Sequence, residues 1–118
     1  MDIDAMVRAY MVAALWSSTL DDQGTPMDSR YGIDDIAPDS RKRMERDCRR
    51  FAKANAEDLE ALGAESAGHD FWLTRNRHGA GFWDRGLGEL GERLTRAAQL
   101  EGECNLYLGD DGKIHIGS

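Results

Sequence analysis

The sequence predicts an α+β fold in which two N-terminal helices precede a strand, a third helix and a C-terminal β-hairpin. Apolar residues recur at helical spacing through the first half of the chain. The short run Phe71–Arg75 is predicted to be the first strand, and two apolar segments flank the turn-forming residues Asp110-Asp111-Gly112 near the end. The three strands would form a small sheet packed on helices. A length of 118 residues predicts a single domain, 1–118.

Residues 1–62 are predicted to form the helical half of this domain, with helices over 3–20 and 38–62. Pro38 suits the first turn of the second helix, and Gly63 suits the position just after its end. The inward face of that helix follows steps of three and four residues through Met44, Cys48, Phe51, Asn55, Leu59 and Leu62. The segment 21–37 is predicted to be a long loop with one short helical turn. Three apolar residues would hold it to the core: Tyr31, Ile33 and Ile36.

Residues 63–118 are predicted to form the strand-helix-hairpin half, with the third helix over 87–99. The register of the hairpin follows from burial. A two-residue turn would place the apolar residues of its two strands on opposite faces of the sheet. A three-residue loop places them on one face, pairing Leu108 with Ile114, and puts Gly112 in the left-handed conformation of a bulge. Burial therefore favours the three-residue loop.

The chain carries a formal net charge of −7, which disfavours binding of nucleic acid or an anionic membrane by the molecule as a whole. The N-terminus lacks the basic start of a signal peptide, and the apolar run 9–16 is too short to span a bilayer. These features predict a cytoplasmic protein with no membrane partner. Cys48 and Cys104 are predicted to be buried thiols rather than a disulfide. No CxxC motif or Cys/His cluster is present, so no metal or cofactor is predicted.

The candidate functional segment is 69–85, where aromatic, charged and glycine residues mix most densely. It holds two of the three His, two of the three Trp and two of the three Phe. Aromatic and Arg side chains beside a glycine loop are typical of binding hot spots. The candidate contact residues are the polar members and one glycine: His69, Asp70, Arg75, Asn76, Arg77, His78, Gly79, Asp84 and Arg85. A structural role, a partner surface and a small-ligand or catalytic site using His69, Asp70 and His78 all remain open.

This segment also resembles a known family. The string HDFWLTRN-x-HGAGFWDRG, with Arg77 at x, is similar to that of a small uncharacterised protein family of tailed bacteriophages and prophages. The resemblance covers about residues 66–116 and does not extend over the first 60 residues. Glycine is common in the family where Arg77 stands, so arginine there either replaces a left-handed turn residue or adds a local charge. The family has no established catalytic role. The resemblance implies a phage accessory protein that acts on host machinery.

Two other charged surfaces are candidates. Between 41 and 53 the chain has seven basic residues against two acidic ones. One stripe of these follows helical steps: Lys42, Arg46, Arg49 and Lys53. These basic residues stand towards the N-terminal end of the predicted helix, where they oppose the helix dipole. Helix stability alone would therefore not select this arrangement. The stripe is a solvated face, a patch for nucleic acid or an acidic partner, or a set of partners for the acidic loop. That loop carries carboxylates that either imitate phosphates or form turns: Asp21, Asp22, Asp34 and Asp35.

The leading expectation is a stoichiometric binder that inhibits a host protein, such as an anti-CRISPR or other anti-defence protein. It depends on the phage resemblance, the acidic charge, the small size and the lack of a catalytic motif. The expected partner is a host protein or protein complex in the bacterial cytoplasm, with the chain a monomer or homodimer. One alternative is a nucleic-acid-binding accessory protein that uses the basic stripe. The other is a small His-dependent enzyme that uses His69, Asp70 and His78, for which the sequence indicates no substrate.

Overall fold

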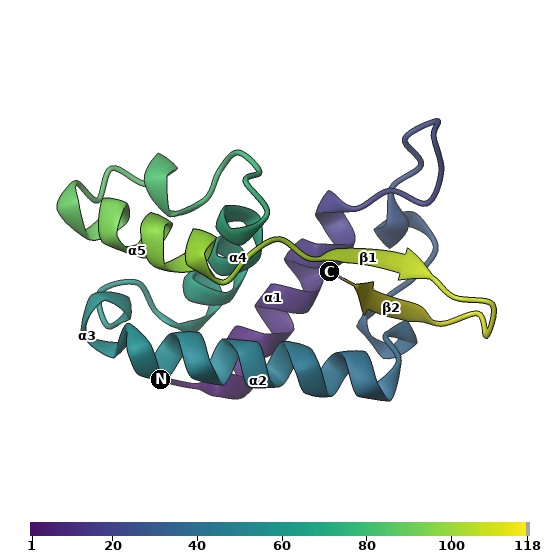
Figure 1. Cartoon of the computed structure of the whole chain (residues 1–118), viewed down its shortest axis with the longest axis horizontal. Coiled ribbons are helices and arrows are strands. Elements are labelled where there is room, and N and C mark those ends of the chain that lie inside the picture. Colours follow the sequence, from purple (N-terminus) through teal and green to yellow (C-terminus); the bar gives the residue numbers. More distant parts are fainter. Residues whose placement is uncertain (118) are drawn as a thin grey trace.

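The computed structural model describes residues 1–117 and is α+β, with one two-stranded antiparallel sheet at one end of a group of helices (Figure 1). The α-helices are α1 (Ile3–Ser17), α2 (Pro38–Ala54), α3 (Ala56–Leu59), α4 (Ala64–Arg75) and α5 (Glu89–Leu100). The strands are β1 (Asn105–Leu108) and β2 (Ile114–Gly117). Short 3₁₀ turns occupy Met27–Ser29, Ile33–Asp35 and Phe82–Asp84. Within the described chain, no helix is long and apolar enough to cross a membrane.

The predicted strand over 71–75 is wrong, because these residues form the second half of α4. This helix packs mainly against α1 and also against α5 and the 3₁₀ turn that follows it. Every side chain from Phe71 to Arg75 is buried as a result. A helix buried on all sides has no polar face, so its apolar run has the same pattern as a buried strand. The described chain therefore has two strands, not the three that the sequence predicts.

The predicted second helix, 38–62, is divided in two. Helix α2 ends at Ala54, and Asn55 leaves the helical conformation with φ −124° and ψ 27°. Its side-chain amide donates to the carbonyl of Phe51 at 3.0 Å, and its backbone N–H donates to the same oxygen. An asparagine side chain that competes for backbone partners in this way favours a helix end. The following turn closes at Gly63, whose φ of +84° suits the glycine predicted there.

The loop between α1 and α2 is folded onto the core by local hydrogen bonds. Met27 is buried, and its N–H donates to the carbonyl of Ser18 at 2.9 Å. Ile36 is buried as predicted, whereas Tyr31 and Ile33 are only half-buried. The loop contains two 3₁₀ turns where the sequence predicts one helical turn.

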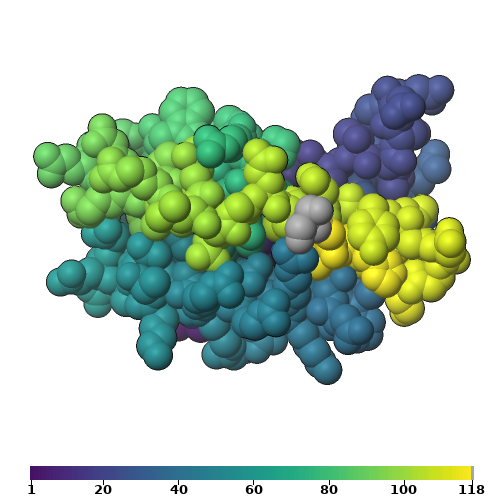
Figure 2. Space-filling view, in the orientation of Figure 1, coloured from purple at the N-terminus to yellow at the C-terminus, as the bar shows by residue number. Residues whose placement is uncertain are grey.

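The hairpin confirms the three-residue loop. Leu108 pairs with Ile114, Leu106 with Ile116, and Gly112 is left-handed with φ +78°. The outer side of β2 is covered by the start of α2, because Ala37 N–H donates to the carbonyl of Ile114 at 2.8 Å. In the space-filling view the hairpin occupies one end of the molecule, and the segment from α4 to α5 covers much of the other (Figure 2).

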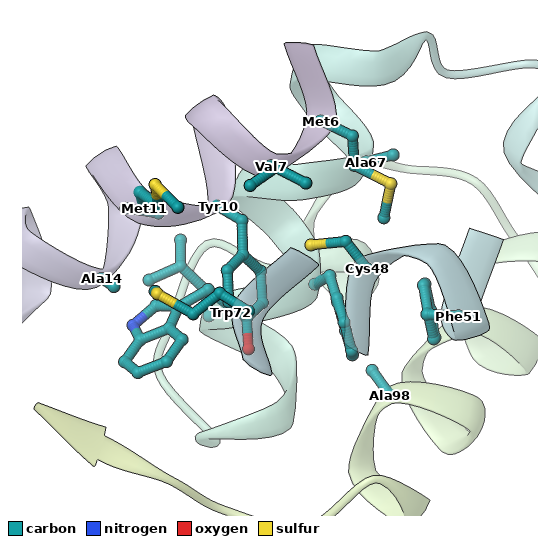
Figure 3. Close-up of a cluster of buried hydrophobic side chains, with 14 of the residues drawn as sticks. Met6, Val7, Tyr10, Met11, Ala14, Cys48, Phe51, Ala67, Trp72 and Ala98 are labelled. Atoms are coloured by element: carbon teal, nitrogen blue, oxygen red, sulfur yellow. The ribbon is translucent and has the colours of Figure 1, made fainter. Parts of the chain in front are cut away.

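The core lies where α1, α2 and α4 meet (Figure 3). Phe51 stacks on Phe71 with ring centroids 4.0 Å apart, and Trp72 meets Tyr10 edge-on at 5.3 Å. Cys48 and Cys104 are buried free thiols, as predicted. Burial raises the pKa of the Cys48 thiol, and the neighbouring Asp47 carboxylate raises it further. Because thiolate is the reactive form, this thiol is a packing residue.

Candidate functional site

The candidate site is an open groove between α1 and the first half of α4, with a volume of about 580 Å³. Small residues on both helices make it possible. Gly68 brings α4 so close to α1 that an added Cβ would lie 2.0 Å from the carbonyl oxygen of Met6. The groove is lined by Ala5, Arg8, Ala9, Val12, Leu62, Glu65, Ser66, His69, Asp70 and Arg85. It therefore brings together three of the predicted site residues.

Asp70 connects the other two, His69 and Arg85, at one wall of the groove. Its carboxylate is 1% exposed and accepts two hydrogen bonds from Arg85, at 3.1 Å from Nε and 2.8 Å from Nη2. The side-chain hydrogen bond to Asp70 raises the pKa of Arg85. His69 Nδ1 lies 3.1 Å from Oδ1 of the same carboxylate. A bidentate pair fixes the plane of a guanidinium, so Arg85 is presented in one orientation although it is partly exposed.

The α1 wall supplies aromatic and apolar surface that the sequence analysis missed. Val12 lines the groove, and Trp16 lies beyond it with 56% of its surface exposed. The Trp16 ring lies 6.1 Å from that of His69, measured between centroids. Arg8 lines the same wall, is exposed, and forms no ion pair with any described residue. The signal was available in the sequence, because residues 8, 12 and 16 follow helical steps of four.

The chemistry of the groove favours binding over catalysis. Ser66 and His69 both line it, but no hydrogen bond joins them in the described chain. Nucleophilic catalysis needs a hydroxyl or thiol within reach of a base, and both cysteines are buried elsewhere. His78, the predicted partner of His69, does not line the groove. The groove offers one fixed guanidinium and a second, Arg8, that has no ion pair within the described chain, and the exposed Trp16 lies beside the groove.

Arg75 was predicted to be an exposed contact residue like the other polar members of 69–85, but it is buried, with 2% of its surface exposed. Its guanidinium donates to Asp47 Oδ2 and to the Tyr10 hydroxyl, each at 3.0 Å. It also donates to the carbonyls of Gly102 and Glu101, at 2.8 and 3.0 Å. Burial acts against the charge, but Tyr10, Cys104 and Asp47 more than offset it and raise the pKa of Arg75. Its role is structural.

Asn76 also serves the fold. Its side-chain oxygen accepts from the backbone N–H of Cys104 at 2.9 Å, and its amide donates to the carbonyl of Trp72 at 3.1 Å. It therefore fixes the start of the hairpin segment against the end of α4. Four other predicted residues are exposed and lie outside the groove: Arg77, His78, Gly79 and Asp84. Arg77 keeps the left-handed turn with φ +59°, so arginine at this position retains the conformation that glycine favours.

The two charged surfaces lie elsewhere. All four residues of the basic stripe are exposed on α2, and Arg49 pairs with Glu45 on the same helix at 3.0 Å. In the acidic loop, Asp21 accepts from Thr25 and Gln23, and these hydrogen bonds, led by that of the Thr25 hydroxyl, lower the pKa of Asp21. Asp35 accepts from the N–H of Gly32. Asp21 and Asp35 therefore act as turn formers, while Asp22 and Asp34 are exposed.

No protein-family model, curated protein or solved structure matches the chain. The case for a function therefore depends on the groove between α1 and α4 and on the residues that line it.

Proposed function

We propose that this chain is a stoichiometric protein-binding module that inhibits or redirects a host protein, and that the groove is its contact surface. The observation that carries the proposal is the pairing of a fixed guanidinium with exposed aromatic surface. Arg85 is held by the buried Asp70, and Trp16 is exposed beside His69. Tryptophan and arginine dominate binding energy at protein interfaces.

The chemistry of the groove also defines the partner segment. Its α1 side offers small apolar side chains, because Ala5 and Ala9 line it there. Arg8 has no ion pair within the described chain, and Arg85 remains partly exposed. We infer that the partner presents a helix with a small apolar face and at least one carboxylate, which would meet Arg8. Laying an apolar helix face into such a groove is a common recognition mode.

The phage context of the proposal comes from the segment 69–85. Its likeness to a family of phages and prophages makes host machinery the expected target. A host defence complex, such as a CRISPR effector, is the target to test first. Small size and acidic charge suit a protein that occupies a basic surface of such a complex.

The test replaces Trp16 by alanine and measures inhibition of purified candidate effectors and capture of host proteins. We expect Trp16→Ala to weaken binding by about 30-fold, the equivalent of roughly 2 kcal/mol, because it removes a hot-spot side chain. Trp83→Ala is the matched control, since Trp83 is 58% exposed but has no ring contact with a described residue of the groove, whereas the Trp16 ring lies 6.1 Å from that of His69. That variant should bind within about twofold of the unmodified chain. The proposal fails if the protein in excess inhibits no effector and captures no host protein.

A second candidate function is nucleic-acid binding by the basic stripe. Lys42, Arg46 and Lys53 are exposed on one side of α2, where phosphate groups can reach them. This function predicts that affinity for duplex DNA falls steeply between about 50 and 200 mM salt. Replacing Arg46 and Arg49 together by glutamate should abolish binding. Arg96→Glu, an equal change of charge per residue at an exposed site on α5, should have a much smaller effect. If the double variant and Arg96→Glu lost equal affinity for duplex DNA, the stripe would be ruled out as the binding face.

A further inference from the structure

One backbone edge of strand β1 has no hydrogen-bond partner among residues 1–117. The Gly109 N–H donates to the carbonyl of Lys113 at 2.8 Å, which makes these two residues a hydrogen-bonded pair at the end of the ladder. In an antiparallel ladder such pairs alternate with non-hydrogen-bonded ones. The pairs Leu108–Ile114 and Leu106–Ile116 are therefore non-hydrogen-bonded. The N–H and C=O groups of these four residues point away from the partner strand.

The two edges of the sheet differ in what meets these groups. On β2 they are used: the carbonyl of Ile114 accepts from Ala37, and the N–H of Ile116 donates to Ser40 Oγ at 3.0 Å. Strand β2 thus lies between β1 and the start of α2 (Figure 1). On β1, no described residue bonds to the outward groups of Leu106 and Leu108. An edge of this kind is a template for another strand.

The side chains around this edge indicate what it binds. Tyr107 is 53% exposed and stacks on His115 with centroids 5.5 Å apart, and Leu108 is 44% exposed. Exposed carboxylates stand at both ends of the strand, Glu103 before it and Asp110 after it. Glu103 forms an exposed ion pair with Arg77 at 3.7 Å, which a basic residue of a partner would have to replace or share. Seven residue steps separate these two acids, which corresponds to roughly 23 Å along an extended chain. Apolar side chains between two acidic ends are complementary to an extended segment with basic residues at both ends.

We propose that β1 binds such a segment of a partner protein, which adds to the hairpin as a third strand. Backbone hydrogen bonds to Leu106 and Leu108 supply the pairing, Tyr107 and Leu108 supply apolar contact, and the acidic ends select basic residues. A second copy of this chain fits less well. In a symmetric antiparallel pair of β1 strands, the acidic end at Glu103 of one copy would approach the acidic end at Asp110 of the other, and like charges there repel. This site is independent of the groove between α1 and α4.

The experiment selects displayed random decapeptides on the full-length protein and compares the Leu108→Pro variant. Proline removes the outward N–H of Leu108, a position where proline is tolerated because the hairpin does not use that group. We expect selected peptides to carry basic residues at both ends and to bind Leu108→Pro at least tenfold more weakly. Hydrogen exchange of the Leu106 and Leu108 amides should slow when a selected peptide binds.

A second variant keeps the test decisive if proline disturbs the hairpin. Replacing Glu103 by Gln and Asp110 by Asn leaves the backbone edge intact, and it should weaken the basic peptides at least fivefold without affecting neutral ones. The proposal is overturned if no peptide prefers the unmodified chain to both variants. It is also overturned if the two amides become protected with rising protein concentration alone, which would identify a second copy as the occupant. Binding to the groove would leave both amides unchanged.

Discussion

Replacing Arg75 by methionine is expected to lower the free energy of unfolding by about 3–5 kcal/mol, because a buried carboxylate loses its buried partner and keeps the hydrogen bond from the half-exposed Arg50 at 3.2 Å. Asp47 is that carboxylate, 3% exposed and 3.0 Å from Nη1 of Arg75. The same guanidinium donates to the Tyr10 hydroxyl and to the carbonyls of Glu101 and Gly102. One side chain thus connects α1, α2, α4 and the link from α5 to β1.

Thermal and urea unfolding followed by circular dichroism measures this loss, which corresponds to a fall in Tm of roughly 12–20 °C. The matched control is Arg49→Met, because Arg49 is exposed on α2 and pairs only with Glu45. It should change stability by less than about 0.5 kcal/mol. The double variant Asp47→Leu with Arg75→Met removes both charges and should recover at least about 1 kcal/mol of the single loss. A loss below about 1 kcal/mol for Arg75→Met would contradict the assignment of the pair as a principal support of the fold.

Arg75 also shows why the sequence misled about α4. Short apolar runs look alike in buried strands and buried helices, and only the surrounding elements decide between them. Here α1, α5 and the 3₁₀ turn at Phe82 surround the helix, so even its polar residues Asp70, Thr74 and Arg75 are buried. A polar residue in such a place needs partners that come from distant parts of the chain. Spacing along the sequence does not indicate them.

The hairpin was predictable for the opposite reason. Its partners lie within a few residues, so alternation of apolar side chains and a glycine at the turn determine its register. The groove falls between these cases. The segment 69–85 pointed to His69, Asp70 and Arg85, but the wall that faces them comes from α1, more than fifty residues earlier. Only tertiary packing reveals that Trp16 and His69 are neighbours.

Replacing Gly68 by alanine is expected to destabilise the protein by about 3 kcal/mol, at the upper end of the usual cost of overpacking. Inside a helix, replacing glycine by alanine normally stabilises a protein by roughly 0.5–1 kcal/mol. Here the close packing against α1 is expected to turn that gain in the free energy of unfolding into a loss. The added Cβ would lie 2.0 Å from the carbonyl oxygen of Met6 and 3.0 Å from the amide nitrogen of Tyr10. Both are backbone atoms, which cannot rotate away, so α1 and α4 must separate. Urea unfolding measures the cost directly.

Gly32→Ala is the control for this prediction, because no atom lies within 4 Å of the added Cβ and the backbone is extended there with φ −117°. It should change stability by less than about 0.5 kcal/mol. Gly68 lies between Ser66 and His69 on α4, so separating the helices also widens the groove that these residues line. Below its unfolding temperature, Gly68→Ala should therefore weaken groove binding while leaving peptide binding at β1 unchanged. Unchanged stability in Gly68→Ala would mean that α1 and α4 do not need this close contact, and the shape of the groove would then have another cause.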